Sequence, residues 1–157
     1  MEQLLREQLK EAAREKGICE DGFSKLSADD VASLVDYYIQ HPDWGLSHDF
    51  PSIEVLREYS ELLESKGVYV EKTFTGELLN DRQAYVFIGC KGKISVGLNV
   101  EKRIIPMLYF GNKCRMRVIG VGEITPRQAT KVPIYAYGKN DISAHTNKYV
   151  KFNIYER

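Results

Sequence analysis

A weak repeat in the second half of the chain constrains the fold more than any other sequence feature. Each copy consists of an apolar or aromatic run, a glycine turn and an alternating strand. The copies align on Gly89, Gly111 and Gly138. A period of this size predicts stacked coils, because no single coil buries its apolar face alone. The expected fold class is α+β, with short N-terminal helices followed by a C-terminal β-solenoid. An antiparallel β-sandwich is the alternative.

The two halves of the chain differ in charge and in apolar periodicity. Residues 1–66 hold 7 Lys or Arg against 15 Asp or Glu, whereas residues 67–157 hold 15 against 7. At Val68 the apolar period changes from about 3.6 to about 2. We therefore expect an acidic helical region at 1–66 and a basic β-rich region at 67–157. Such asymmetry can mark a basic binding face or an acidic region that covers one.

Three short helices are expected in the acidic region. The first covers residues 2–16. The second begins at Ser27, which is a favourable N-cap, and ends at Pro42. The third begins at Ser52 and ends at Gly67, a typical helix stop.

The segment between the second and third helices gathers His41, Asp43, His48 and Asp49 around the only tryptophan, Trp44. Histidine and aspartate can act as metal ligands or as acid–base groups. The spacing of the two histidines matches no known ligand set, so an interhelix loop is the favoured interpretation. We expect no metal and no cofactor.

The cysteines and the N-terminus limit the class of protein. Cys19, Cys90 and Cys114 form neither a disulfide framework nor a CxxC pair, and the last two occupy inward strand positions. They are expected to be buried thiols. No catalytic motif is present, so an enzyme is not expected. The charged N-terminus lacks the hydrophobic region of a signal peptide, and no apolar run is long enough to span a membrane. A cytoplasmic protein is therefore expected.

Basic residues dominate the strands on either side of the glycine turns. Between residues 82 and 131 there are ten Lys or Arg against two Glu. Alternation directs one basic set outward, and these are the candidate anion-binding residues: Lys91, Lys93, Lys113, Arg115 and Arg117. Aligning Gly89 over Gly111 places Lys91 beside Lys113 and Lys93 beside Arg115. A bound polyanion, the acidic helices or simple solvation could offset the repulsion.

Apolar and aromatic side chains complete the predicted repeat. The glycine alignment gives Ile94, Met116 and Ile142 equivalent inward positions, so all three are expected to be buried and stacked. Several aromatic residues interleave with the basic ones, which suits single-stranded nucleic acid in principle. They are Tyr85, Phe87, Tyr109 and Phe110. Alternation, however, places many of them in the core.

Two stretches together resemble a group of small uncharacterised proteins encoded by phages and mobile elements of gut Bacteroidetes. One runs from His48 to Glu58 and includes the segment HDFPS, followed by Gly67-Val68-Tyr69-Val70. The other is the repeat itself. Proteins of this group have a helical N-terminal part and repeated short strands of a solenoid type. The resemblance covers roughly residues 25–155. It implies an intracellular, accessory and non-enzymatic protein, and it transfers no catalytic residue.

The function expected from the sequence is a non-enzymatic interaction or structural module, serving as an accessory protein of a phage or mobile element. The alternative is a binder of nucleic acid or another anionic ligand that uses the basic β face. The strand expected at Tyr149–Tyr155 would either cap the fold or pair with a copy of itself. The expected partners are thus an unknown protein and a second copy of the chain. Nucleic acid is a less favoured partner, and no membrane is expected.

Overall fold

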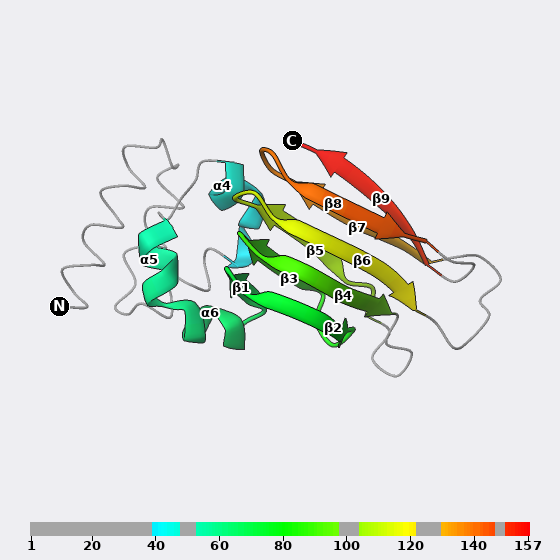
Figure 1. The fold of residues 1–157 in the computed structure, drawn as a ribbon, viewed down its shortest axis with the longest axis horizontal. Coiled ribbons are helices and arrows are strands. Elements are labelled where there is room, and N and C mark those ends of the chain that lie inside the picture. Colours follow the sequence, from blue (N-terminus) through cyan, green and yellow to red (C-terminus); the bar gives the residue numbers. More distant parts are fainter. Residues whose placement is uncertain (1–38, 48–52, 98–103, 122–129, 147–149) are drawn as a thin grey trace. The chain divides into compact units, whose positions relative to one another are not determined.

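The chain divides into two compact units, Met1–Lys66 and Gly67–Arg157. The computed structural model describes residues 39–47, 53–97, 104–121, 130–146 and 150–157. In the first unit it contains the helices α4 (Pro42–Ser47), α5 (Ile53–Glu58) and α6 (Ser60–Ser65) (Figure 1).

The first unit confirms one predicted helix end, replaces part of a predicted loop and divides another predicted helix. Helical backbone at Ile39 and Gln40 stops before His41, in agreement with a helix that ends at Pro42. The interhelix loop expected next is wrong over Pro42–Ser47, which form α4, because the fixed φ of Pro42 suits the first helical position. The predicted helix behind Pro51 is present as α5 and α6, with Tyr59 between them. Gly67 follows with a φ of 87° and ends the helical segment. The predicted helix at 2–16 and most of the one from Ser27 lie outside the described residues.

The described residues of the second unit form nine strands rich in β-branched and aromatic residues, which favour extended backbone. Five odd-numbered strands form one sheet in the order β1-β3-β5-β7-β9, and four even-numbered strands form the other in the order β2-β4-β6-β8. The first sheet contains β1 (Val68–Val70), β3 (Ala84–Ile88), β5 (Met107–Gly111), β7 (Thr130–Ala136) and β9 (Val150–Glu156). The second contains β2 (Thr73–Leu79), β4 (Lys91–Gly97), β6 (Arg115–Val121) and β8 (Asp141–His145).

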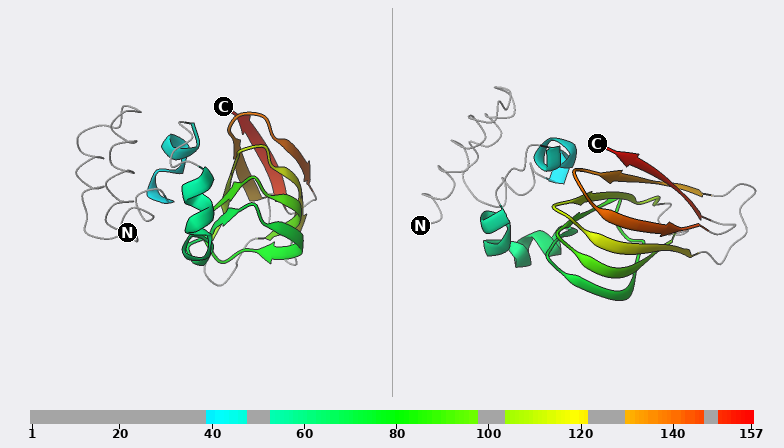
Figure 2. Two further views of the ribbon diagram at one scale, coloured as in Figure 1. Left: turned by 60° about the vertical axis from the view of Figure 1, so that its left-hand side comes forward. Right: turned by 45° about the horizontal axis from the view of Figure 1, so that its top comes forward.

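The two sheets enclose one hydrophobic core (Figure 2). Consecutive strands along the chain belong to alternate sheets. Along each strand, every second side chain points to the space between the two sheets, so both sheets contribute to the same core. Phe87 and Phe110 of adjacent strands stack there, with ring centroids 4.8 Å apart. Ile94 and Val118 face them from the second sheet and have no exposed surface. All the fully packed members of this core cluster lie between Phe74 and Val150.

The predicted fold class is wrong. Every strand pairing is parallel, which excludes the antiparallel β-sandwich. A β-solenoid repeats a coil of near-constant length, but here the interval between paired residues changes from Val68↔Val86 to Leu108↔Ile134. The strands instead form two separate parallel sheets accompanied by a few short helices, which is closer to a parallel α/β arrangement. The intervals between paired residues vary because the segments that connect the strands differ in length.

The predicted stack of Ile94, Met116 and Ile142 is also out of register. Met116 pairs with Ile142 on one side and with Gly92 on the other, while Ile94 pairs with Val118. Ile94 and Met116 are buried as expected, but Ile142 is only partly buried. The alignment on glycines fails for two reasons. Gly111 pairs with Ile88 and not with Gly89, and the turn between β5 and β6 is one residue longer than the turn between β3 and β4.

Candidate functional site

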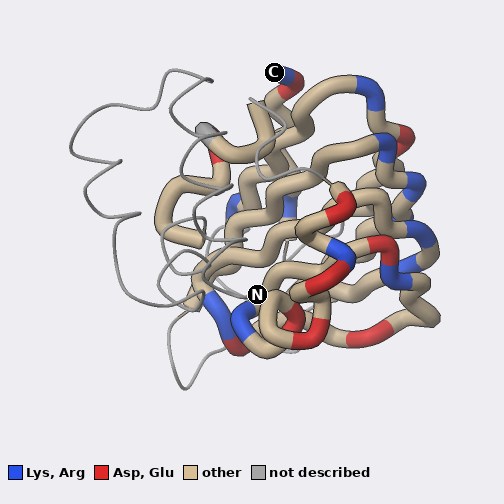
Figure 3. The backbone as a smooth tube through the Cα atoms, turned by 90° about the vertical axis from the view of Figure 1, so that its left-hand side faces the viewer, with Lys and Arg blue, Asp and Glu red and all other residues tan. Residues whose placement is uncertain are grey.

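The outer face of the four-stranded sheet carries two rows of like charge. Lys91 of β4 pairs directly with Arg115 of β6, and Lys93 pairs with Arg117 two positions further on. We call these four residues the basic rows. All four side chains are exposed, whereas the residues between them on each strand point inward. In Figure 3, blue positions follow one another along the right-hand side of the β unit.

This arrangement is electrostatically unfavourable in the isolated sheet. Neighbouring strands lie about 4.8 Å apart, and like charges directly opposite each other destabilise a strand pair. In the part of the chain that the structure describes, Lys91, Lys93 and Arg117 form no ion pair. Because all three side chains are exposed, water solvates their charges.

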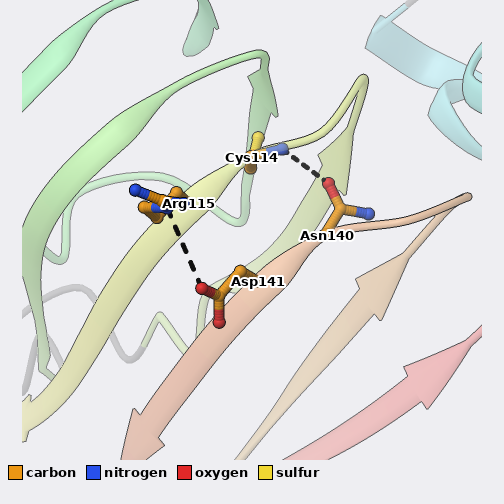
Figure 4. A network of polar contacts seen from close by, with 4 residues as sticks. All are labelled: Cys114, Arg115, Asn140 and Asp141. Atoms are coloured by element: carbon orange, nitrogen blue, oxygen red, sulfur yellow. Dashed lines mark hydrogen bonds and ion pairs between the residues drawn. The ribbon is translucent and has the colours of Figure 1, made fainter.

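The acidic groups on the same four strands are placed at the margins of the basic rows. Arg115 Nε lies 3.9 Å from Asp141 Oδ2 of β8, and both side chains are about four-fifths exposed (Figure 4). An ion pair this exposed, with this separation between its charged atoms, contributes little to the stability of the fold. On β2, the Glu77 carboxylate accepts the Thr75 amide proton at 2.7 Å. Hydrogen bonds from its own backbone and from Thr75 hold the pKa of Glu77 below its usual range.

A shallow groove of about 400 Å³ lies over the basic rows. Its polar walls come from all four strands, and Gly92 and Met116 complete its lining. The lining residues are Thr73, Lys91, Gly92, Arg115, Met116, Arg117, Asp141 and Ser143. Gly92 has no side chain, and a Cβ there would meet the Phe74 backbone of the neighbouring strand β2. The groove thus combines three cations and two hydroxyl groups with one carboxylate, that of Asp141, on an open surface.

Lys113 does not belong to the basic rows, which corrects the sequence-based placement. It lies in the turn between β5 and β6, and both it and Asn112 have positive φ values near 60°. The turn residue Cys114 donates its amide proton to Asn140 Oδ1 at 2.8 Å (Figure 4). Lys91 consequently neighbours Arg115, not Lys113, and Lys93 neighbours Arg117. Aligning Cys90 with Cys114 in the sequence would have given this register.

None of the four interleaved aromatic residues can contact a ligand on this face, because all four lie on β3 or β5 of the other sheet. Tyr85, Phe87 and Phe110 lie in the core with almost no exposed surface, and Tyr109 is 7% exposed on the other sheet. The Tyr85 hydroxyl donates a proton to Asp81 Oδ1 and accepts the amide protons of Asp81 and Arg82. Burial and the bond to Asp81 raise the pKa of Tyr85 to about 12. No aromatic platform therefore adjoins the basic rows within the described strands.

Cys90 and Cys114 are buried, as expected, at neighbouring strand starts. Cys90 Sγ donates to the Tyr69 carbonyl at 3.2 Å, and Cys114 Sγ donates to the Gly111 carbonyl at 3.2 Å. Burial raises the pKa of the Cys90 thiol to about 12 and also raises that of Cys114. Thiols so held are poor nucleophiles at neutral pH.

The histidine- and aspartate-rich segment is only partly described. His41 directly precedes α4, and Asp43 is exposed in its first turn. His48 and Asp49 lie outside the described residues. Among the described ranges there is no group of three or more histidine, cysteine and acidic residues that could hold a metal ion. None of the described helices has both the length and the apolar character that a membrane span requires.

Comparisons with protein-family models, with curated proteins and with solved structures find no match for this chain.

Proposed function

We propose that this protein is a non-enzymatic binding module whose basic rows bind a phosphate-bearing polyanion. One observation carries the proposal: two directly opposed cation pairs occupy adjacent strands of an exposed sheet face. An anion that bridges such a pair relieves the repulsion between its two cations. This relief adds to the favourable free energy of binding. In keeping with the sequence resemblance, the proposed setting is an accessory role in a phage or mobile element.

The spacing of the basic rows favours a nucleic acid backbone. Side chains two residues apart on a strand are separated by about 6.6 Å, twice the rise per residue. This spacing is of the same order as that between successive phosphates of an extended nucleic acid strand, so one strand could engage both rows at once. Lysine and arginine contacts to phosphate supply affinity without reading base sequence. The hydroxyl groups of Thr73 and Ser143, at the groove margins, can add neutral hydrogen bonds.

Binding is tested with a fluorescently labelled single-stranded DNA, a duplex of the same sequence and heparin. Anisotropy titrations at low and moderate salt should show affinity that falls steeply as salt rises, because binding releases counterions. The double variant Lys93→Ser and Arg117→Ser should weaken binding. Its salt slope on single-stranded DNA should fall by about 0.7 for each phosphate that the variant no longer neutralises.

A matched control removes the same charges from the other sheet. Lys131 and Lys151 are exposed and pair directly on β7 and β9, so they form an equivalent like-charge pair. The double variant Lys131→Ser and Lys151→Ser should bind with nearly unchanged affinity and salt slope. Equal losses in the two double variants would mean that net charge alone drives binding. Absence of binding at low salt would show that the basic rows are a solvated surface only.

A further inference from the structure

Strand β9 ends the five-stranded sheet among the described strands. It is seven residues long and, in the part of the chain that the structure describes, pairs on one side only, with β7. Two of the four exposed large hydrophobic residues in the described chain lie on it, Ile154 at 44% and Tyr155 at 43%. Proteins usually protect such edges with proline, a bulge or a covering segment, and β9 contains neither proline nor a bulge.

The backbone of β9 presents hydrogen-bonding groups in a fixed alternation. The Arg157 amide donates to the Ala136 carbonyl, and the Arg157 carbonyl accepts from the Gly138 amide. In a strand, every second residue directs both groups to the same side. Residues 151, 153 and 155 therefore bond toward β7, and Phe152, Ile154 and Glu156 direct their amides and carbonyls to the open edge.

The side chains of this edge continue two features of the sheet. On the inner face, Ile154 extends the row that begins with Leu108 and Ile134, and it is exposed because the core ends there. On the outer face, Tyr155 ends a stack of tyrosine rings. Its ring lies 5.2 Å from that of Tyr135, which in turn lies 5.1 Å from Tyr109.

We propose that β9 pairs antiparallel with β9 of a second copy of this chain, forming a two-fold symmetric dimer. The register that centres on Asn153 places Phe152 opposite Ile154 of the second copy and joins the open ends of the two cores. It also places Lys151 beside the ring of Tyr155 of the second copy, where a cation–π contact stabilises the pair. In this register the backbone amides and carbonyls that point to the open edge of one copy face those of the second copy, as antiparallel hydrogen bonding requires.

Charge selects this register over its neighbours. A shift by one pleat in one direction places Lys151 opposite Arg157 of the second copy and Phe152 opposite Glu156. Like charges at that distance and a carboxylate against an aromatic ring both oppose pairing. A shift in the other direction leaves Tyr155 and Glu156 beyond the end of the second strand. The strand is thus self-complementary in one register, which identifies the second copy as its occupant.

Sedimentation velocity of the full chain over a range of concentrations tests the dimer. Wild-type protein should sediment as a dimer, and Ile154→Lys should be monomeric because it introduces a charge opposite Phe152 of the second copy. Leu78→Lys is the matched control. Leu78 is 53% exposed on β2 of the other sheet, and this variant should remain dimeric. Thermal unfolding followed by circular dichroism confirms that both variants fold.

A crosslink tests the register independently of the edge variant. In the Cys19→Ser background, Asn153→Cys should form an intermolecular disulfide under mild oxidation, because facing residues at the two-fold axis lie about 4.5 Å apart between Cα atoms. Ser143→Cys, exposed on β8, should not. A monomeric wild type, a dimer that survives Ile154→Lys, or equal crosslinking at both positions would overturn the proposal. None of these outcomes depends on polyanion binding.

Discussion

At the scale of single residues, burial sets the chemistry of the titratable groups in the β unit. Cys90 is 1% exposed, and its thiol hydrogen-bonds to a backbone carbonyl 3.2 Å away. A thiolate at this position would lose hydration without gaining a cation. The pKa of the thiol therefore rises from 9.0 to about 12. Tyr85 follows the same physics, and its pKa rises to about 12 from 10.0.

We expect the free energy of unfolding to decrease as the pH rises above about 9. The unfolded Cys90 thiol loses its proton near pH 9.0, whereas the folded thiol keeps it to about 12. The stabilisation is fully present below pH 9 and is lost as pH rises toward 12, by up to about 1.4 kcal/mol per pH unit for one group. Urea denaturation between pH 7 and 11 measures this. Cys90→Ala should flatten the slope between pH 9 and 11, and an unchanged slope would contradict the assignment.

At the scale of elements, the pairing of β2 with β4 depends on a close backbone contact. The register shifts between Thr75 and Glu77, so β2 bulges at Gly76. Opposite this segment, Gly92 has a φ of 111°, and a Cβ there would lie 2.0 Å from the Phe74 carbonyl oxygen. Only glycine fits both the conformation and the approach. The same glycine is part of the lining of the groove.

Gly92→Ala should destabilise the protein by more than about 2 kcal/mol, because it adds a backbone clash to the cost of a positive φ. Gly138→Ala is the control. Its φ is 76°, but a Cβ there would meet nothing within 4 Å, so it should cost about 1–2 kcal/mol from the backbone conformation alone. Urea midpoints of the two variants give the comparison. Equal midpoints would show that β2 moves away from β4 without cost.

At the scale of the whole molecule, the β unit contains its own core. Every buried member of the core cluster lies within residues 67–157, and the described strands of this unit pair with one another. A unit with its own core can fold independently of the rest of the chain.

Residues 67–157 expressed alone should therefore fold and unfold in one cooperative transition, measured by far-ultraviolet circular dichroism during urea denaturation. Their affinity for single-stranded DNA should equal that of the full chain within a few-fold, because all four basic residues belong to this unit. Much tighter binding by this fragment would instead show that residues 1–66 cover the basic rows. A fragment without cooperative unfolding would contradict the independence of the core.

The sequence by itself determined the local properties of this chain. Alternation identified the inward cysteines and the outward residues Lys91, Lys93, Arg115 and Arg117, since successive strand side chains point to opposite faces. The change of period at Val68 indicated where the strands begin.

Only the tertiary structure decided how strands distant in the sequence align. Gly111 pairs with Ile88, and the turn that contains Asn112 and Lys113 is one residue longer than the turn before β4. Together these two features place Lys93 opposite Arg117 instead of Arg115. Alternation within one strand carries no information about its neighbour. The parallel pairing, the grouping into two sheets and the exposed edge of β9 all follow from non-local hydrogen bonds and from a core that both sheets share.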